Sequence, residues 1–195
     1  MTTREPAFDL GPAAERVAGL LNGIGDDGLA APTPCGWDVA TLLDHLMGLT
    51  VAFRDGARKI DGPATAGAPE PSGDALDPAW RRLLPARLEE LAAAWREPDA
   101  WVGATRVGGV TMPADVMACV ALNELVIHGW DLARGTGQAY AVDPASLERV
   151  LPFLEESASE EGTPGLFGPR VEVPDDAGPL ERALGLSGRD PSWSA

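Results

Sequence analysis

The sequence PADVMACVALNELVIHGWDLARG, residues 113–135, decides the fold. Proline is favoured in the first turn of a helix and glycine just beyond its end. We therefore expect a helix that begins at Pro113, runs to about Arg134 and ends at Gly135 or Gly137. Apolar side chains fall on nearly every face of this helix. Such a helix is typical of the centre of a bundle, where other helices cover it from several sides.

Four polar residues interrupt this apolar helix: Asn123, Glu124, His128 and Asp131. Buried polar groups are costly without partners, so these side chains indicate a specific site. Glu124 and His128 are four residues apart and share one face of the helix, where both can hold one metal ion. Asp131 lies on the same face. It could orient His128 by accepting a hydrogen bond from the second ring nitrogen, or bind the ion directly; we favour the first role.

A metal site needs a third ligand, and His45 is the other of the two histidines in the chain. It lies in a separate predicted helix, and bundles assemble metal sites from facing helices. Three nitrogen and oxygen ligands with an open position are typical of catalytic zinc sites, and they also suit nickel, cobalt or ferrous iron better than calcium or magnesium. The alternative is a core pair, in which His128 donates to Glu124 without a metal and His45 is unrelated.

The remaining sequence predicts further helices around the central one, because apolar residues recur at steps of three and four and Pro or Gly marks the ends. The expected elements are helices at about 11–24, 38–53, 77–95 and 143–157, a hairpin or irregular crossover within 98–111, a flexible loop at 62–77 and a short helix at 179–186. We therefore divide the chain into a helical bundle, residues 1–160, and an irregular tail, residues 161–195, that packs on it.

Composition and charge exclude several classes of function. The chain has 195 residues, enough for one well-packed domain, and its 15 Lys and Arg against 30 Asp and Glu give a net charge of −15. Nucleic-acid binding needs a basic surface, so we expect no nucleic-acid partner. The N-terminus lacks a signal architecture, and no run reaches the roughly 18 apolar residues of a membrane span. We expect a cytoplasmic protein without a membrane partner, in which Cys35 and Cys119 stay reduced.

Two stretches carry a resemblance to a known family. They are Thr33-Pro34-Cys35-Gly36-Trp37-Asp38-Val39, followed by Asp44-His45-Leu46, and Glu124-Leu125-Val126-Ile127-His128-Gly129-Trp130-Asp131-Leu132-Ala133. They resemble the signature segments of the DinB-like superfamily, in the branch of the N-terminal domain of mycothiol-dependent maleylpyruvate isomerase and its small uncharacterised relatives. The tail, from Leu166 to Pro169 and from Gly188 to Pro191, resembles the closing segment of those relatives. The resemblance covers nearly the whole chain apart from the 62–77 loop.

The resemblance implies an all-α fold, an up-down-down-up four-helix bundle, here with an extra C-terminal helix and an irregular tail. It implies a divalent metal held by His45, Glu124 and His128; zinc is the first expectation, with nickel or iron as alternatives. It also implies a low-molecular-weight thiol such as mycothiol or bacillithiol as cosubstrate, in a transferase or isomerase that acts on a small electrophile. A Lewis-acidic ion would favour the thiolate and so generate a strong nucleophile near neutral pH.

The sequence also departs from this family. The isomerase has a second, C-terminal domain that contributes to its active site, whereas this chain ends soon after the fourth long helix. We therefore do not expect maleylpyruvate isomerase activity itself. Two other classes stay open: a non-catalytic metal-binding or stress-associated dimerisation module, and a purely structural dimer without a metal. A homodimer is thus considered alongside the small-molecule partners.

Further residues near the predicted ligands could line a pocket, although none can be named as catalytic. Trp37 and Trp130 could wall a thiol pocket, but core packing is the commoner role of buried tryptophans. Arg134 could bind a carboxylate of the substrate or cofactor; we favour a role at the helix C-terminus or in a surface ion pair. Cys35 lacks a CxxC partner and is expected to be structural or incidental. Cys119 is expected to be a small core residue.

Overall fold

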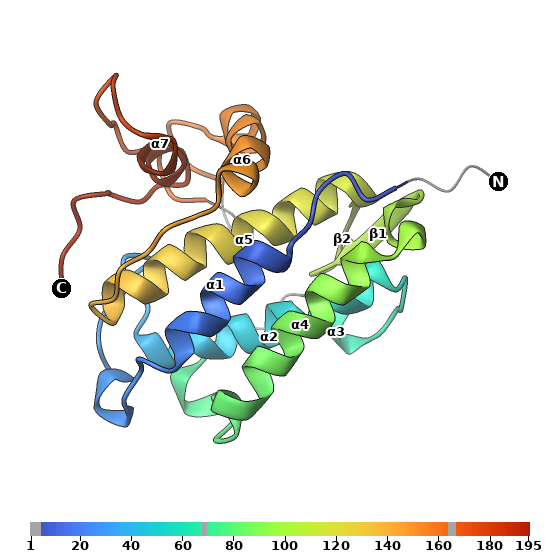
Figure 1. Ribbon diagram of the computed structural model, residues 1–195, viewed down its shortest axis with the longest axis horizontal. Coiled ribbons are helices and arrows are strands. Elements are labelled where there is room, and N and C mark those ends of the chain that lie inside the picture. The colour runs from blue at the N-terminus through green and yellow to red at the C-terminus, as the bar shows by residue number, and fades with distance from the viewer. Residues whose placement is uncertain (1–4, 68–69, 164–166) are drawn as a thin grey trace.

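The computed structural model describes residues 5–67, 70–163 and 167–195 and is mostly helical (Figure 1). Within these residues, four long helices form a bundle that a short hairpin and smaller helices flank. The helices are α1 Gly11–Leu21, α2 Val39–Ala57, α3 Pro63–Ala66, α4 Trp80–Arg96, α5 Ala114–Gly135, α6 Pro144–Ser157 and α7 Pro179–Leu186, and the strands are β1 Ala104–Val107 and β2 Val110–Pro113.

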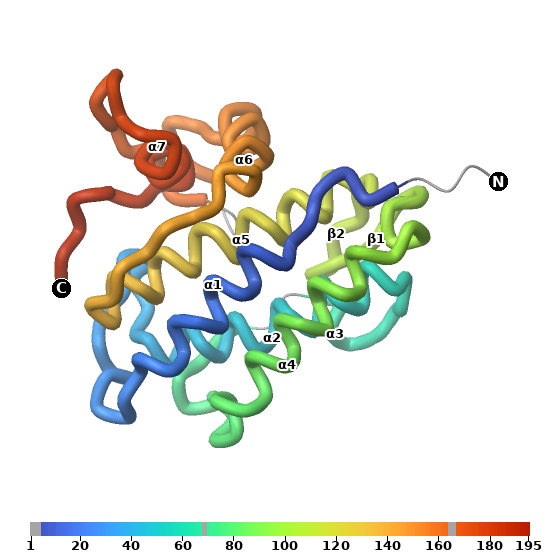
Figure 2. The backbone as a smooth tube through the Cα atoms, in the orientation of Figure 1, coloured from blue at the N-terminus to red at the C-terminus, as the bar shows by residue number. Residues whose placement is uncertain are grey.

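The bundle consists of α1, α2, α4 and α5. Helices α1 and α5 run away from the end that carries the hairpin, whereas α2 and α4 run towards it (Figures 1 and 2). Helix α1 packs against α4 and α5, and α2 packs against the same two helices, so α1 and α2 occupy diagonal positions. This is the up-down-down-up arrangement predicted from the sequence, and the predicted all-α class is confirmed with one small hairpin added.

Helix α5 is the centre of the molecule. It contacts α1, α2, α6 and both strands of the hairpin. Leu122, Leu125, Val126 and Leu132 on this helix are fully buried. By length and composition α5 is apolar enough to cross a membrane, yet 83% of that apolar window is buried inside the protein. Contacts with the neighbouring helices therefore account for its apolar surface, as predicted for a central helix.

The segment predicted as a flexible loop, 62–77, is more ordered than expected. It contains α3 and a 3-10 turn at Gly73–Ala75. Side chains of α2 hold it, because Asp44 Oδ2 accepts from the Ser72 amide at 3.0 Å and Thr41 Oγ1 accepts from the Gly73 amide at 3.0 Å. The scarcity of large apolar residues predicted mobility, but polar contacts fix the segment instead. Residues 68–69 lie outside the described residues.

The segment from 98 to 111 contains both alternatives that the sequence left open. A 3-10 turn at Pro98–Trp101 leads into a hairpin in which β1 and β2 pair antiparallel. Val107 pairs with Val110, and the two residues between them, Gly108 and Gly109, both have positive φ. Glycine tolerates that backbone conformation, so the Gly-Gly pair suits this tight turn.

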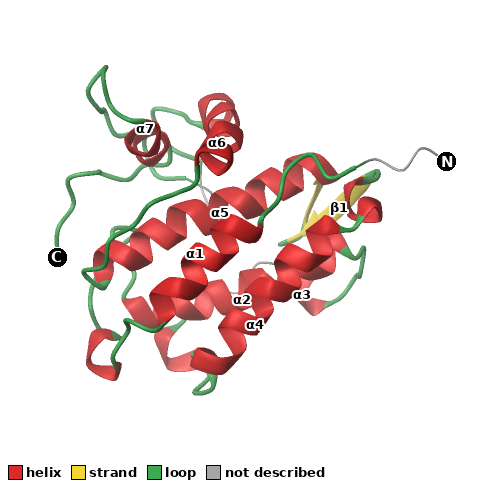
Figure 3. Ribbon diagram, viewed as in Figure 1, coloured by secondary structure: helices red, strands yellow, loops and turns green. Residues whose placement is uncertain are grey.

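Helices α6 and α7 lie next to each other on the outer side of α5 (Figures 1 and 3). Both begin at a proline and have the predicted bounds. The last residues of the chain return towards the end of α5, where Arg134 Nε donates to the Trp193 carbonyl at 3.2 Å. The tail therefore lies against the helix that carries two of the predicted ligands. Leu166, which contributed to the family resemblance, lies outside the described residues.

Candidate metal centre

The three predicted ligands meet where α2 faces α5. His45, on α2, and His128, on α5, each place Nε2 3.2 Å from the same oxygen of Glu124, Oε2. The centroids of the two imidazole rings are 4.8 Å apart, and the three ligand atoms lie within 4.8 Å of one another. The i,i+4 spacing on α5 therefore aligns Glu124 with His128, and the packing of α2 against α5 adds His45.

The geometry of this cluster fits a divalent ion. Zinc binds nitrogen and oxygen ligands at about 2.0–2.2 Å, so ligand atoms around a tetrahedral ion are separated by roughly 3.4 Å. The two separations of 3.2 Å to Glu124 Oε2 are close to that value. The side chains of His45, Glu124 and His128 are 25%, 16% and 9% exposed, so the cluster is enclosed but reachable from solvent. The residues present can thus hold an ion with one position left for another ligand.

Contacts within the cluster shift the pKa values of Glu124 and His128. Burial by itself raises the pKa of this carboxyl, but the hydrogen bonds from His128 and His45 outweigh burial and hold the pKa well below its usual range. Burial likewise lowers the pKa of His128, but Asp131, Cys35 and Glu124 raise it well above the ordinary value. Glu124 is therefore a carboxylate whose partners are two imidazoles, and a metal ion would compete with protons for the same nitrogen atoms.

A tight turn before α2 covers the cluster. The Thr33 amide donates to the Trp37 carbonyl at 2.9 Å, Thr33 Oγ1 donates to the same carbonyl at 2.8 Å, and Gly36 has a φ of +85°. This turn places the Trp37 ring against both imidazoles, at 5.1 Å from His45 and 6.0 Å from His128 between centroids. The second ring pair is stacked, with 21° between the planes. Trp37 thus forms an aromatic wall beside the ligands.

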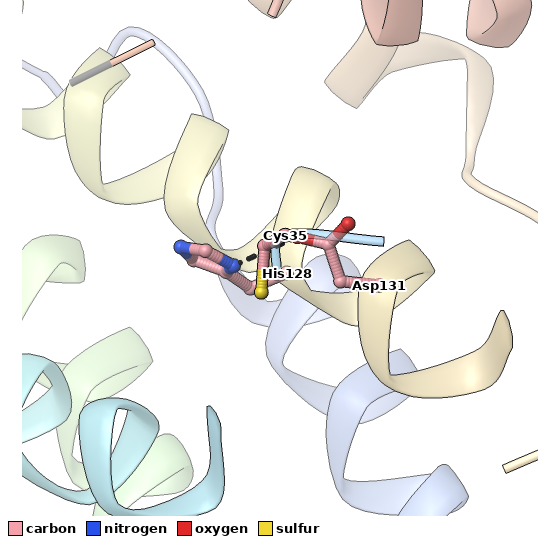
Figure 4. Close-up of side chains that lie close together, drawn as sticks. All are labelled: Cys35, His128 and Asp131. Carbon is pink, nitrogen blue, oxygen red and sulfur yellow. Dashed lines mark hydrogen bonds and ion pairs between the residues drawn. The ribbon is translucent and has the colours of Figure 1, made fainter. Parts of the chain in front are cut away.

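The second nitrogen of His128 belongs to a separate set of contacts (Figure 4). His128 Nδ1 lies 3.0 Å from Asp131 Oδ2, and the Asp131 side chain is fully buried. Arg189, from the tail, donates through Nη2 to Asp131 Oδ2 at 3.0 Å. Cys35 Sγ lies within 4.8 Å of ligand atoms of both His128 and Asp131. Asp131 is therefore placed to accept a hydrogen bond from His128 Nδ1, and its role in orienting a metal ligand stays a prediction.

The other predicted pocket residues are not all near the cluster. Trp37 is in contact with both imidazoles, whereas Trp130 is buried on α5 with the Arg134 guanidinium 5.9 Å from its ring. Arg134 in turn donates to the Trp193 carbonyl through Nε and Nη2. The structure therefore places Arg134 in the attachment of the tail, near the C-terminus of α5.

Sequence reasoning missed two residues at this site. Cys35 was expected to be structural or incidental, and the turn before α2 brings its sulfur to His128. Arg189 was assigned no role, although it supplies the charge that balances Asp131. A buried aspartate on an apolar helix signals that a cation must lie nearby, but the sequence does not reveal which of the basic residues supplies it.

Fold and cluster together define a class of protein: a four-helix bundle in which one helix supplies a histidine and the facing helix supplies a Glu-x-x-x-His pair. The chain belongs to the family of the mycothiol maleylpyruvate isomerase N-terminal domain, which matches residues 10–133. That match includes His45, Glu124 and His128, and it ends before α6, α7 and Arg189. The predicted DinB-like branch is confirmed.

Other proteins are similar to this chain in sequence or in fold. Two uncharacterised proteins of Mycobacterium tuberculosis are each 26% identical over 181 residues, which is 91% of this chain and 93% of the relative. A crystal structure of mycothiol-dependent maleylpyruvate isomerase has a TM-score of 0.59 and 22% identity, with 76% of this chain and 67% of that chain covered. The crystal structure of a histidine-to-alanine mutant of that isomerase has a TM-score of 0.60 and 20% identity, with 77% of this chain and 71% of that chain covered. These structures share the fold.

Proposed function

We propose that the protein binds a divalent metal ion through His45, Glu124 and His128 and uses it to activate a low-molecular-weight thiol of the mycothiol type. The reaction would be a transfer or an isomerisation of a small electrophile in the cytoplasm. The observation that carries this proposal is the convergence of two imidazole nitrogens, from different helices, on one carboxylate oxygen at 3.2 Å each. Mixed nitrogen and oxygen ligands favour zinc, with nickel and iron as the alternatives.

Each residue of the site has a distinct role in this proposal. His45, Glu124 and His128 bind the ion, and Asp131 keeps His128 Nδ1 protonated so that Nε2 is free to coordinate. A bound divalent ion acts as a Lewis acid and lowers the pKa of a coordinated thiol. The Trp37 ring excludes water from one side of the imidazoles and offers an apolar surface to a thiol or substrate.

Two observations support the thiol in particular. The family takes its name from a mycothiol-dependent enzyme, and its matched residues include all three candidate ligands. The cluster is also partly open, because the His45 side chain is 25% exposed. An enclosed structural zinc site would instead have four protein ligands and no position for a thiol.

Elemental analysis of protein purified without an affinity tag tests the metal. We expect close to one equivalent of a divalent metal in the wild-type protein and a large loss in both His45→Ala and His128→Ala. Glu155→Gln, which alters an exposed carboxylate on α6, is the control and should keep the metal. A stoichiometric metal that survives both histidine substitutions would show that the ion binds elsewhere.

Cobalt substitution tests the thiol. Mycothiol should perturb the visible spectrum of the cobalt-loaded protein, because a sulfur ligand entering the open position changes the ligand field. A thiol-free alcohol analogue of mycothiol is the control and should leave the spectrum unchanged. If the protein binds cobalt but millimolar mycothiol changes nothing, the proposed thiol is wrong, and the alternative of a non-catalytic metal-binding module is favoured.

A further inference from the structure

A continuous series of contacts joins the C-terminal tail to the candidate metal ligands. Arg189 donates to Asp131 through Nη2 at 3.0 Å and through Nε at 3.4 Å. Asp131 Oδ2 lies 3.0 Å from His128 Nδ1, and His128 Nε2 lies 3.2 Å from Glu124 Oε2. Arg189 and Asp131 are 58 residues apart in the sequence, so the fold of the tail creates this connection.

The guanidinium of Arg189 is held in place by the end of α7. Its side chain is 10% exposed, and Nη1 donates to the Ser187 carbonyl at 2.8 Å. The Arg189 amide donates to the Leu184 carbonyl at 2.8 Å, which closes the turn that ends α7. Gly188 in this turn has a φ of +80°, and a Cβ there would lie 2.7 Å from backbone atoms of Gly168. The backbone that carries Arg189 is therefore tightly defined.

Asp131 depends on this guanidinium. Its side chain is fully buried, and both of its oxygens accept from the guanidinium, so Arg189 fixes where the carboxylate lies. Without Arg189 the carboxylate would be free to turn away from His128 Nδ1. The His128 ring would then lose the acceptor that orients it. A guanidinium meets a carboxylate with a planar pair of donors, which a lysine ammonium does not reproduce.

We propose that Arg189 is a positioning residue for the metal site: through Asp131 it fixes the orientation of His128 and so determines how tightly the ion is held. This inference rests on the proposed metal binding. It adds a residue that lies outside the segment matched by the family, residues 10–133. The tail is therefore part of the metal centre, although it supplies no ligand.

Metal affinity measured by competition with a chromophoric chelator tests the proposal, with Co²⁺ and Zn²⁺ as the probes. Loss of an outer partner of a ligating histidine weakens metal binding by about 10–100-fold, so we expect roughly tenfold weaker binding in Arg189→Ala. Arg189→Lys should be intermediate, because it keeps the charge but not the paired donors. If Arg189→Ala does not fold, Arg189→Lys carries the test. Equal affinity in the wild type and the folded variant would overturn the proposal.

Arg182→Ala is the matched control. Arg182 also anchors the tail, through an ion pair of 2.6 Å with Glu155 on α6. Among the described residues it has no hydrogen bond or ion pair with Asp131. We expect Arg182→Ala to keep the wild-type metal affinity. Weaker binding in both arginine variants by the same factor would mean that tail docking acts on general stability alone, contrary to the proposal.

A double-mutant cycle with Asp131→Asn separates positioning from stability. If Arg189 acts through Asp131, then Arg189→Ala should cause no further loss of metal affinity in the Asp131→Asn background. Additive losses would contradict the proposal. A wild-type protein that binds neither ion at this site would reject the proposed function and this inference together, whereas tight binding with no effect of Arg189→Ala would reject this inference alone.

Discussion

At the scale of single residues, the carboxylates of Asp131 and Glu124 in the candidate centre have different positively charged partners. Asp131 is fully buried and is neutralised by Arg189. Glu124 has two imidazoles as partners, at 3.2 Å each, and a metal ion bound at their nitrogen atoms would replace the protons that otherwise balance this carboxylate. The two carboxylates lie on one helix, but their different partners give them different roles.

Cys119 should be chemically inert at neutral pH. Burial raises the pKa of its thiol to about 11, and the sulfur lies 3.5 Å from the Arg149 carbonyl. Since the thiolate is the reactive form, alkylation in a Cys35→Ser variant should be slow at pH 8 and should accelerate about tenfold per pH unit up to about 11. Iodoacetamide labelling followed by mass spectrometry measures the rate. Labelling in denaturant is the control, and a plateau near pH 9 in the folded protein would contradict the expectation.

Thr33 should stabilise the turn that carries Cys35 and Trp37. Thr33 is 3% exposed, and its Oγ1 donates to the Trp37 carbonyl at 2.8 Å and lies 3.1 Å from Cys35 Sγ. Thr33→Val keeps the shape and removes both contacts, so we expect a loss of about 1 kcal/mol in the free energy of unfolding, measured by urea denaturation. Thr111→Val, at an exposed position of β2, is the control and should change stability by less than about 0.5 kcal/mol. An equal effect of both substitutions would argue against the hydrogen bond as the cause.

The sequence was enough to predict that Glu124, His128 and His45 lie together, but not that Arg189 lies near them. Helical periodicity places residues i and i+4 on one face, and the chain has one other histidine. The contact of Arg189 with Asp131 spans 58 residues and depends on the turn that ends α7. Cys35 is similar, since its position depends on a turn that contains a glycine with positive φ. Such contacts follow no periodic pattern. The ligand role of the three residues stays a prediction until a metal is measured.

At the scale of helices and strands, the sequence predicted an element best where a proline or a capping side chain marks its start. Helix α6 begins at Pro144, and Asp143 Oδ1 accepts from the Ser146 amide at 2.9 Å, as a capping aspartate should. Helix α1 is shorter than predicted, because it ends at Leu21 whereas Ile24 continues the apolar pattern. Ile24 is nevertheless 4% exposed. The spacing of apolar residues therefore predicted the burial of Ile24 correctly but placed the end of the helix too late.

Gly135, the last residue of α5, should not tolerate replacement by a residue with a side chain. A Cβ there would lie 2.7 Å from Thr33 Cγ2 and 2.9 Å from the Pro32 carbonyl oxygen, in the turn that covers the metal centre. We expect Gly135→Ala to lower the free energy of unfolding by about 1–3 kcal/mol, because the backbone oxygen cannot easily move away. Urea denaturation monitored by circular dichroism measures the change.

Gly19→Ala is the matched control for that substitution. Gly19 is exposed in the last turn of α1, and a Cβ there would meet nothing within 4 Å. Alanine is the better helix former, so Gly19→Ala should raise stability by about 0.5–1 kcal/mol. Stabilisation by both substitutions would show that α5 can move away from the turn, and the tight packing inferred at Gly135 would be wrong.

At the scale of the whole molecule, the excess of acidic residues should oppose folding at low ionic strength. The net charge is −15, and at about 0.01 M salt the screening length of roughly 30 Å lets these charges repel one another across the protein. We expect the midpoint of thermal unfolding to rise between about 0.01 M and 0.15 M NaCl. Differential scanning calorimetry measures it. A fall with added salt would mean that ion pairs such as Arg54 with Glu90, at 2.6 Å, outweigh the repulsion.

The distance along the chain between the candidate ligands has one more consequence. His45 and Glu124 are 79 residues apart and belong to different helices. An ion bound to both would cross-link the chain as a disulfide does and would restrict the unfolded ensemble, by up to about 4.5 kcal/mol for a loop of this length. A chelator would then weaken the fold as well as the chemistry. The metal centre would thus also stabilise the folded bundle, and the fraction of folded protein would depend on the concentration of available metal.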